Sequence, residues 1–126
     1  MKDKKANPEH SQQTNSKELE KQREHIIVEI VEYVPNAVMS RTIIKKSTGT
    51  VTAMSISEGE EISEKKIPFE NYVQVIDGEA DIKIDSKDYH LKVGSGIIIP
   101  AHTTQRFYAR QNFKIISTII KSGYED

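Results

Sequence analysis

The residues of this sequence that are candidates for polar recognition or metal chemistry stand in two short stretches. The first stretch holds Lys65, Ile67 and Asn71, and the second holds His102 and Gln105. At neutral pH Lys65 is an ammonium ion with three hydrogens and no lone pair, and Asn71 and Gln105 offer neutral amides. These groups suit a small polar or anionic molecule, whereas a transition metal prefers imidazoles and carboxylates.

The role of Lys65 depends on where its side chain points. If it points inward, its charge needs an anionic or carbonyl partner. That partner is either a carboxylate or phosphate group of a ligand, or an acid of the protein such as Glu64 or Glu70. The internal acid is the favoured interpretation, because long charged side chains usually find a protein partner or reach water. Both alternatives stay open.

His102 allows a displaced metal site to be considered. With Glu64 and Glu70 it would supply one imidazole and two carboxylates, a set that resembles a facial triad. Strand alternation, however, turns Glu70 to the face opposite Asn71. His102 itself follows a proline in a predicted loop, so an exposed loop histidine is the favoured interpretation. The other histidines are expected in the N-terminal tail, on a solvated helix face and at a surface or interface, respectively: His10, His25 and His90.

Short strands at a regular spacing must position these residues. Turn residues separate the runs, and Asp77-Gly78 predicts a two-residue hairpin turn because both positions tolerate positive φ. Many short strands with glycine punctuation predict a closed or double-sheet β architecture. The expected strands are 37–45, 50–57, 62–67, 71–76, 80–84, 87–91, 97–100, 104–110 and 113–121.

Glycines frame both chemical stretches at fixed distances. In Gly59–Gly78, five residues follow the first glycine before Lys65, and six follow Asn71 before the last glycine. In Gly94–Ala109, five residues separate the glycine from Pro100. This spacing, with a strand pair between the halves, resembles the two motifs of the cupin superfamily. The resemblance implies an all-β fold: a small single-domain, RmlC-like jelly-roll barrel, or double-stranded β-helix, with a short N-terminal helix added.

The cupin motifs place three histidines and one glutamate at four positions that bind a metal. Here those positions hold Lys65, Ile67, Asn71 and Gln105, and His102 replaces a motif glycine. The resemblance therefore implies a degenerate metal site, with no metal and no cofactor. A ligand pocket is expected at the same five residues, and no catalytic residue is assigned.

The family includes sugar-sensing domains beside its enzymes, so a sensor or accessory role that binds a small polar or anionic molecule is expected. The alternative is a cupin-type enzyme, a sugar isomerase or epimerase or a metal-dependent oxygenase, with a non-standard site. A structural dimer with a vestigial pocket is a third possibility. The sequence leaves open whether the chain is an enzyme.

Composition limits the partners. The chain has 126 residues, a net charge of −1, 29% charged residues and no cysteine. No global charge draws it to nucleic acid or to membrane surfaces, and no apolar run approaches the about 20 residues that span a bilayer. A soluble, cytoplasmic protein of one domain is expected.

The N-terminal region is expected to differ from the barrel. Residues 1–17 are almost without apolar side chains and are expected to be disordered, residues 18–36 to form a helix or arm, and residues 37–126 to form the barrel. Several later strands carry isoleucines on both faces, as in Ile97–Ile99. Their outer faces should be covered by the N-terminal helix or by a second subunit, so a homodimer is expected.

Overall fold

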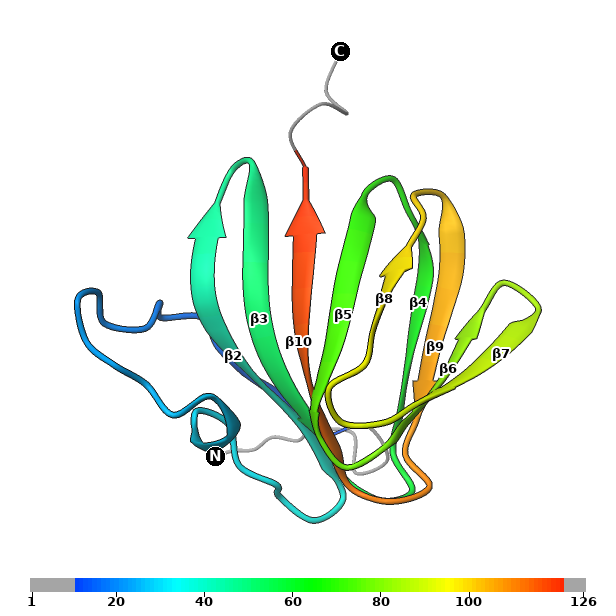
Figure 1. Ribbon diagram of the computed structural model, residues 1–126, viewed down its shortest axis with the longest axis horizontal. Coiled ribbons are helices and arrows are strands. Elements are labelled where there is room, and N and C mark those ends of the chain that lie inside the picture. The colour runs from blue at the N-terminus through cyan, green and yellow to red at the C-terminus, as the bar shows by residue number, and fades with distance from the viewer. Residues whose placement is uncertain (1–10, 122–126) are drawn as a thin grey trace, which may run out of the picture.

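Two β-sheets that face each other build the barrel (Figure 1). The structure is a computed structural model that describes residues 11–121, apart from the side chains at positions 11, 12, 64 and 65. Sheet A has the strand order β1-β2-β3-β10-β5-β8, and sheet B has the order β4-β9-β6-β7. The strands are β1 (Ser11–Asn15), β2 (Ala37–Lys46), β3 (Gly49–Ile56), β4 (Glu61–Ile67), β5 (Glu70–Asp77), β6 (Ala80–Ile84), β7 (Lys87–Leu91), β8 (Gly96–Ile99), β9 (Thr103–Tyr108) and β10 (Phe113–Ile120).

The core lies between the two sheets and follows the alternation of side chains along each strand. On β5, Asn71, Val73 and Val75 are buried while the residues between them are exposed. The same period of two governs the neighbouring strands, so apolar residues from both sheets meet in one cluster. That cluster includes Ile56, Val73, Val75, Ile82, Ile84, Ile99, Phe107, Phe113 and Ile115. The all-β, two-sheet architecture predicted from the sequence is confirmed.

The segment before the barrel is an extended arm, and the predicted α-helix over residues 18–36 is wrong. Its helical part is one 3-10 turn, Ile27–Glu29. The backbone carbonyl of Glu32 accepts a hydrogen bond of 2.7 Å from Ser55 Oγ on β3, and that of Val34 accepts one from Ser57 Oγ. A short helix gains most of its stability from tertiary packing. Here the barrel binds the backbone of the arm instead.

The arm buries part of its apolar surface on the outer face of sheet A. Val31 packs with Ala53 and Ile116 in a second buried cluster, on the side of the sheet opposite the core. Ile26 and Ile27, in contrast, are exposed. The helical spacing of the apolar residues was therefore misleading, because only some of them contact the barrel.

Residues 11–15, which were expected to belong to a disordered tail, form β1 and pair in parallel with β2. The rest of that tail up to residue 10 lies outside the described residues. Over residues 11–121, no helix is long and apolar enough to cross a membrane.

The prediction of a two-residue hairpin at Asp77-Gly78 is also wrong. β5 belongs to sheet A and β6 to sheet B, so the chain passes from one sheet to the other at this point. Gly78 has φ of +72°, and a Cβ atom there would clash with the backbone oxygen of Asn112. The glycine allows a close crossing of two backbones rather than a hairpin turn.

Candidate functional site

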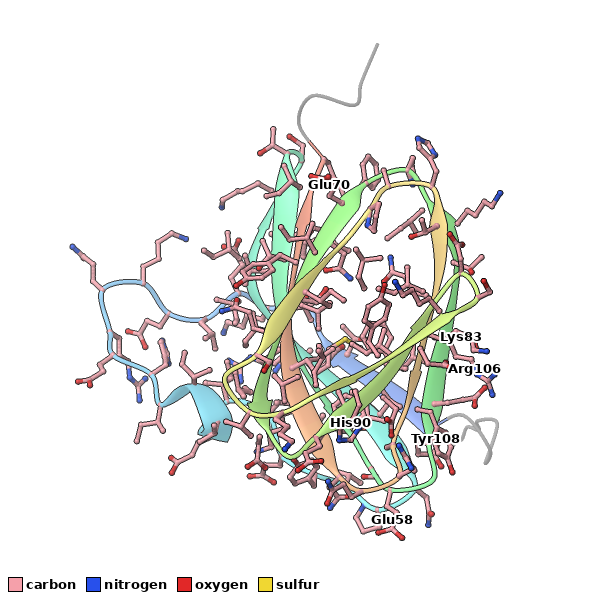
Figure 2. All side chains as sticks on the ribbon, turned by 45° about the vertical axis from the view of Figure 1, so that its right-hand side comes forward. Glu58, Glu70, Lys83, His90, Arg106 and Tyr108 are labelled. Atoms are coloured by element: carbon pink, nitrogen blue, oxygen red, sulfur yellow. The ribbon has the colours of Figure 1, made fainter. Side chains whose placement is uncertain are left out.

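A cavity of about 170 Å³ lies between the two sheets. The cavity lies toward the end of the barrel at which Glu70 lies, opposite Glu58 (Figure 2). Its position follows from two wall residues, since Asn71 pairs with Ile119 near the end of β10. Its walls come from both sheets and combine hydroxyl, amide and apolar side chains. They are Ser40, Thr52, Met54, Ile62, Ile67, Asn71, Gln105, Phe107, Ile115, Ser117 and Ile119.

The strand period explains why two amides face this cavity. On β9, Gln105 and Phe107 are buried, whereas Arg106 and Tyr108 between and after them are exposed. On β5, Asn71 shares the inner face with Val73. Each amide thus occupies a position that would otherwise hold a core apolar residue.

Three polar side chains form a chain of hydrogen bonds within the barrel. Ser117 Oγ donates to Asn71 Oδ1 at 2.7 Å, and Asn71 Nδ2 donates to Gln105 Oε1 at 3.1 Å. All three residues are buried. Because Asn71 and Ser117 lie in sheet A and Gln105 in sheet B, these bonds link the two sheets across the interior.

The structure brings together three of the five predicted pocket residues, Ile67, Asn71 and Gln105. His102 is exposed, has φ of +67° and does not line the cavity. Its backbone N–H donates to the carbonyl of Ile67 at 2.6 Å. The side chain of Lys65 lies outside the described residues.

The described cavity walls do not fit a transition metal. Asn71 and Gln105 supply neutral amides, Ile67 supplies no donor atom, and no described wall residue is a histidine or a carboxylate. The displaced site fits no better, since both His102 and Glu70 are exposed. Among the residues that the structure describes, no group of three or more histidine, cysteine or acidic side chains is placed to hold a metal ion.

None of the three hydroxyl side chains on the cavity wall was predicted from the sequence to line the pocket. Ser40, Thr52 and Ser117 line it together with the aliphatic side chains of Met54 and Ile119. Strand alternation puts Thr52 and Met54 on one face of β3. What the sequence did not indicate is which strands meet across the barrel, and therefore which inner faces share the cavity.

A second group of polar residues covers the outer face of sheet B, and Figure 2 shows Lys83, Arg106 and Tyr108 on this side. Arg106 bonds Glu61 at 2.9 Å, and Lys83 lies 3.8 Å from Asp88. Both cations are exposed and already paired, so a ligand would compete for them with their carboxylate partners and with water, and exposed pairs are weak. This face is therefore a weaker candidate for ligand binding than the cavity.

At one corner of that face His90 lies between two carboxylates. Its Nδ1 is 2.8 Å from Asp81 Oδ1, and its Nε2 is 2.6 Å from Glu79 Oε1. Hydrogen bonds first to Asp81 and then to Glu79 raise the pKa of His90 above its ordinary value. Hydrogen bonds from Arg110, the largest cause, lower the pKa of Asp81 to about 2. His90 is a surface residue within an ion-pair network.

Two facing sheets closed around an inner cavity define a small β-barrel of the double-stranded β-helix class. No family model and no curated protein matches the sequence. Solved structures do match. A conserved protein of unknown function from Streptococcus pyogenes superposes with a TM-score of 0.77 at 24% identity, covering 83% of this chain and 92% of its own.

Two further solved structures are cupins. A cupin superfamily protein from Desulfitobacterium hafniense has a TM-score of 0.76 at 22% identity, over 84% of this chain and 97% of its own. A cupin 2 conserved barrel domain protein from Leptotrichia buccalis has a TM-score of 0.71 at 29% identity, over 75% of this chain and 46% of its own. The fold is the cupin barrel, as the glycine spacing predicted.

Proposed function

We propose that this protein is a metal-free cupin domain that binds a small polar molecule in its barrel, in a sensor or accessory role. The supporting observation is the cavity of about 170 Å³ with the buried Ser117–Asn71–Gln105 network on its wall. Buried polar side chains cost stability unless they are hydrogen-bonded. Within this network the nitrogen of Gln105 is the group without a partner among the described residues, and a bound ligand would satisfy it.

The donor set supports binding without a metal. Neutral amide oxygens are poor ligands for iron, nickel, manganese or zinc compared with imidazole and carboxylate. We therefore expect the purified protein to carry no stoichiometric transition metal. Elemental analysis that finds near one equivalent, lost on substitution of His102, would contradict this.

An anionic ligand is the second form of the same proposal. Its charge would have to be met by Lys65, because the described walls of the cavity carry no ionisable group. If organic acids stabilise the protein, Lys65→Met should remove that effect while keeping most of the side-chain volume.

A thermal-shift screen tests the proposal, because a ligand that binds only the folded state stabilises it, by about 2.7 kcal/mol at a hundredfold excess over Kd. Neutral ring compounds, sugars, sugar phosphates and small organic acids should be included. The variant Ile119→Phe narrows the cavity, and Ile120→Phe places the same ring on the outer face of β10. A true ligand raises the Tm of the wild type and of Ile120→Phe, but not of Ile119→Phe. Equal shifts in all three proteins, or none, would overturn the proposal.

A further inference from the structure

The hydrogen-bond chain in the barrel has a direction. Ser117 donates to the oxygen of the Asn71 amide, which turns the nitrogen of Asn71 toward Gln105. Asn71 then donates to the oxygen of the Gln105 amide, which turns the nitrogen of Gln105 away from both residues. Each bond thus fixes the orientation of the next amide.

This series of hydrogen bonds ends at a donor that has no partner among the described residues. Gln105 Nε2 has no hydrogen-bond partner among the described residues, although the side chain is only 2% exposed. An amide nitrogen carries two N–H groups. Leaving a buried donor unpaired destabilises the folded state, so a bound acceptor atom would relieve a cost that the fold already carries.

The rest of the wall limits what can carry that acceptor. The described wall has no ionisable side chain, and its apolar part comes largely from Met54, Ile67, Phe107, Ile115 and Ile119. An apolar cavity of about 150 Å³ in another protein holds benzene, so about 170 Å³ suits one small ring or a branched chain of similar size.

We propose that the cavity selects a small uncharged molecule, of about the size of one ring, that accepts a hydrogen bond from Gln105 Nε2 through a carbonyl-type oxygen. Asn71 is the positioning residue, because it fixes which end of the Gln105 amide faces the ligand. This inference rests on the proposed function, since it assigns the ligand class of the same cavity.

Three matched probes separate the contributions to binding. Cyclopentanone is an uncharged ring that only accepts hydrogen bonds, pyrrole is a ring that donates one, and methylenecyclopentane has no polar atom. Titration is followed by NMR through the methyl groups of Ile115 and Ile119, which line the cavity. The methyl groups of Ile98, exposed on the outer face of β8, serve as the reference.

The first test removes the donor. Gln105→Met keeps the length of the side chain but has no N–H group. We expect cyclopentanone to bind about tenfold more weakly, the loss of about 1.4 kcal/mol that one buried hydrogen bond represents. Methylenecyclopentane should bind as well as before or better. The control Gln74→Met makes the same change on the exposed face of β5 and should alter neither affinity.

The second test reverses the amide. In Asn71→Asp the carboxylate has no N–H group and can only accept hydrogen bonds. It accepts one from the Ser117 hydroxyl and a second from the nitrogen of Gln105. The Gln105 amide is then reversed, so its oxygen faces the cavity. Pyrrole should then bind more tightly than in the wild type and cyclopentanone more weakly. If the introduced carboxylate prevents folding, Ser117→Ala provides the same readout in weaker form, because it removes the bond that orients Asn71.

The outcomes distinguish the ligand class from the proposed function. If no probe moves the Ile115 and Ile119 methyl signals, the cavity does not bind small rings and both proposals fail. If methylenecyclopentane binds but Gln105→Met affects all probes equally, the cavity binds ligands and the carbonyl assignment is wrong. Tighter binding of acetate than of cyclopentanone would likewise overturn the uncharged class and point to Lys65.

Discussion

The ammonium group of Lys114 on β10 lies 4.8 Å from the centre of the Tyr33 ring in the N-terminal arm. Lys114 also donates to the backbone carbonyl of Val28, and the Tyr33 hydroxyl donates to Asp77 Oδ2 at 2.7 Å. Each of these contacts joins the arm to a strand of sheet A. The arm is therefore part of the folded unit, although its helical content is a single turn.

Tyr33→Phe should lower the free energy of unfolding by about 1–2 kcal/mol, because it removes a hydrogen bond to a carboxylate and leaves Asp77 without that donor. Chemical denaturation measures this. Tyr108→Phe is the control, since the structure shows no hydrogen bond from the exposed Tyr108 hydroxyl to the residues that it describes. Equal effects of the two variants would contradict a structural role for the arm contact.

The same contact has a pH dependence. Burial, and then the hydrogen bond to Asp77, raises the pKa of Tyr33 well above its ordinary value. A raised pKa in the folded state stabilises the protein fully below the unfolded pKa, and that contribution is lost as pH rises through the folded value. The alkaline loss of stability should therefore be smaller in Tyr33→Phe than in the wild type, as denaturation at a series of alkaline pH values would measure. An identical alkaline loss in the two proteins would contradict the effect of Tyr33.

Gly78→Ala should destabilise the protein by about 2–5 kcal/mol. A positive φ costs a residue with a side chain about 1–3 kcal/mol, and overpacking adds a similar amount. At Gly78 the added carbon would meet the backbone at Asn112 and Phe113. Gly59→Ala is the matched control, because Gly59 also has a positive φ but no atom within 4 Å of the added carbon. Similar losses of unfolding free energy in both variants, measured by chemical denaturation, would contradict the close crossing of the backbones.

The sequence was enough to predict the barrel because glycine spacing and strand alternation are local signals. Gly59, Gly78 and Gly94 all have positive φ, a conformation that residues with a side chain rarely adopt. This is the physical reason why glycine stands at these three motif positions. The alternation of side chains along a strand puts Asn71, Val73 and Val75 on one face of β5, and all three are buried. The spacing of the second glycine-framed stretch, Gly94–Ala109, likewise predicted Gln105 as a pocket residue, and Gln105 lines the cavity.

Pairings between distant segments could not be predicted in this way. The Ser117 hydroxyl reaches Asn71 across 46 positions in the sequence. No local pattern distinguishes that serine from an exposed one in a strand. The prediction of a helix over residues 18–36 failed for a related reason. The carbonyl groups of this segment accept hydrogen bonds from Ser55 and Ser57, which come later in the sequence, so no local pattern indicates these contacts.

Asp81→Asn should lower the pKa of His90 more than Glu79→Gln does, because Asp81 is the larger cause of the raised value. NMR titration of the imidazole protons measures both. His90 stabilises the fold below its unfolded pKa, and this contribution is lost as pH rises through the folded pKa, so each variant should flatten the stability profile above pH 6.5. Asp88→Asn is the control, since Asp88 pairs with Lys83 rather than with His90. A shift as large in the control would show that only the total surface charge matters.

A homodimer through the outer face of sheet A remains a prediction, and the structure narrows where to test it. The arm covers Ile116 on this face, whereas Ile98 on β8 is 64% exposed and its register partner Tyr72 is 44% exposed. Adjacent exposed apolar side chains favour association. Ile98→Lys should therefore convert a dimer to a monomer of 14.3 kDa in light scattering, whereas Ile26→Lys, at an exposed site on the arm, should not. A wild-type protein that is already monomeric at micromolar concentration, or a dimer that survives Ile98→Lys, would overturn the assignment of this face.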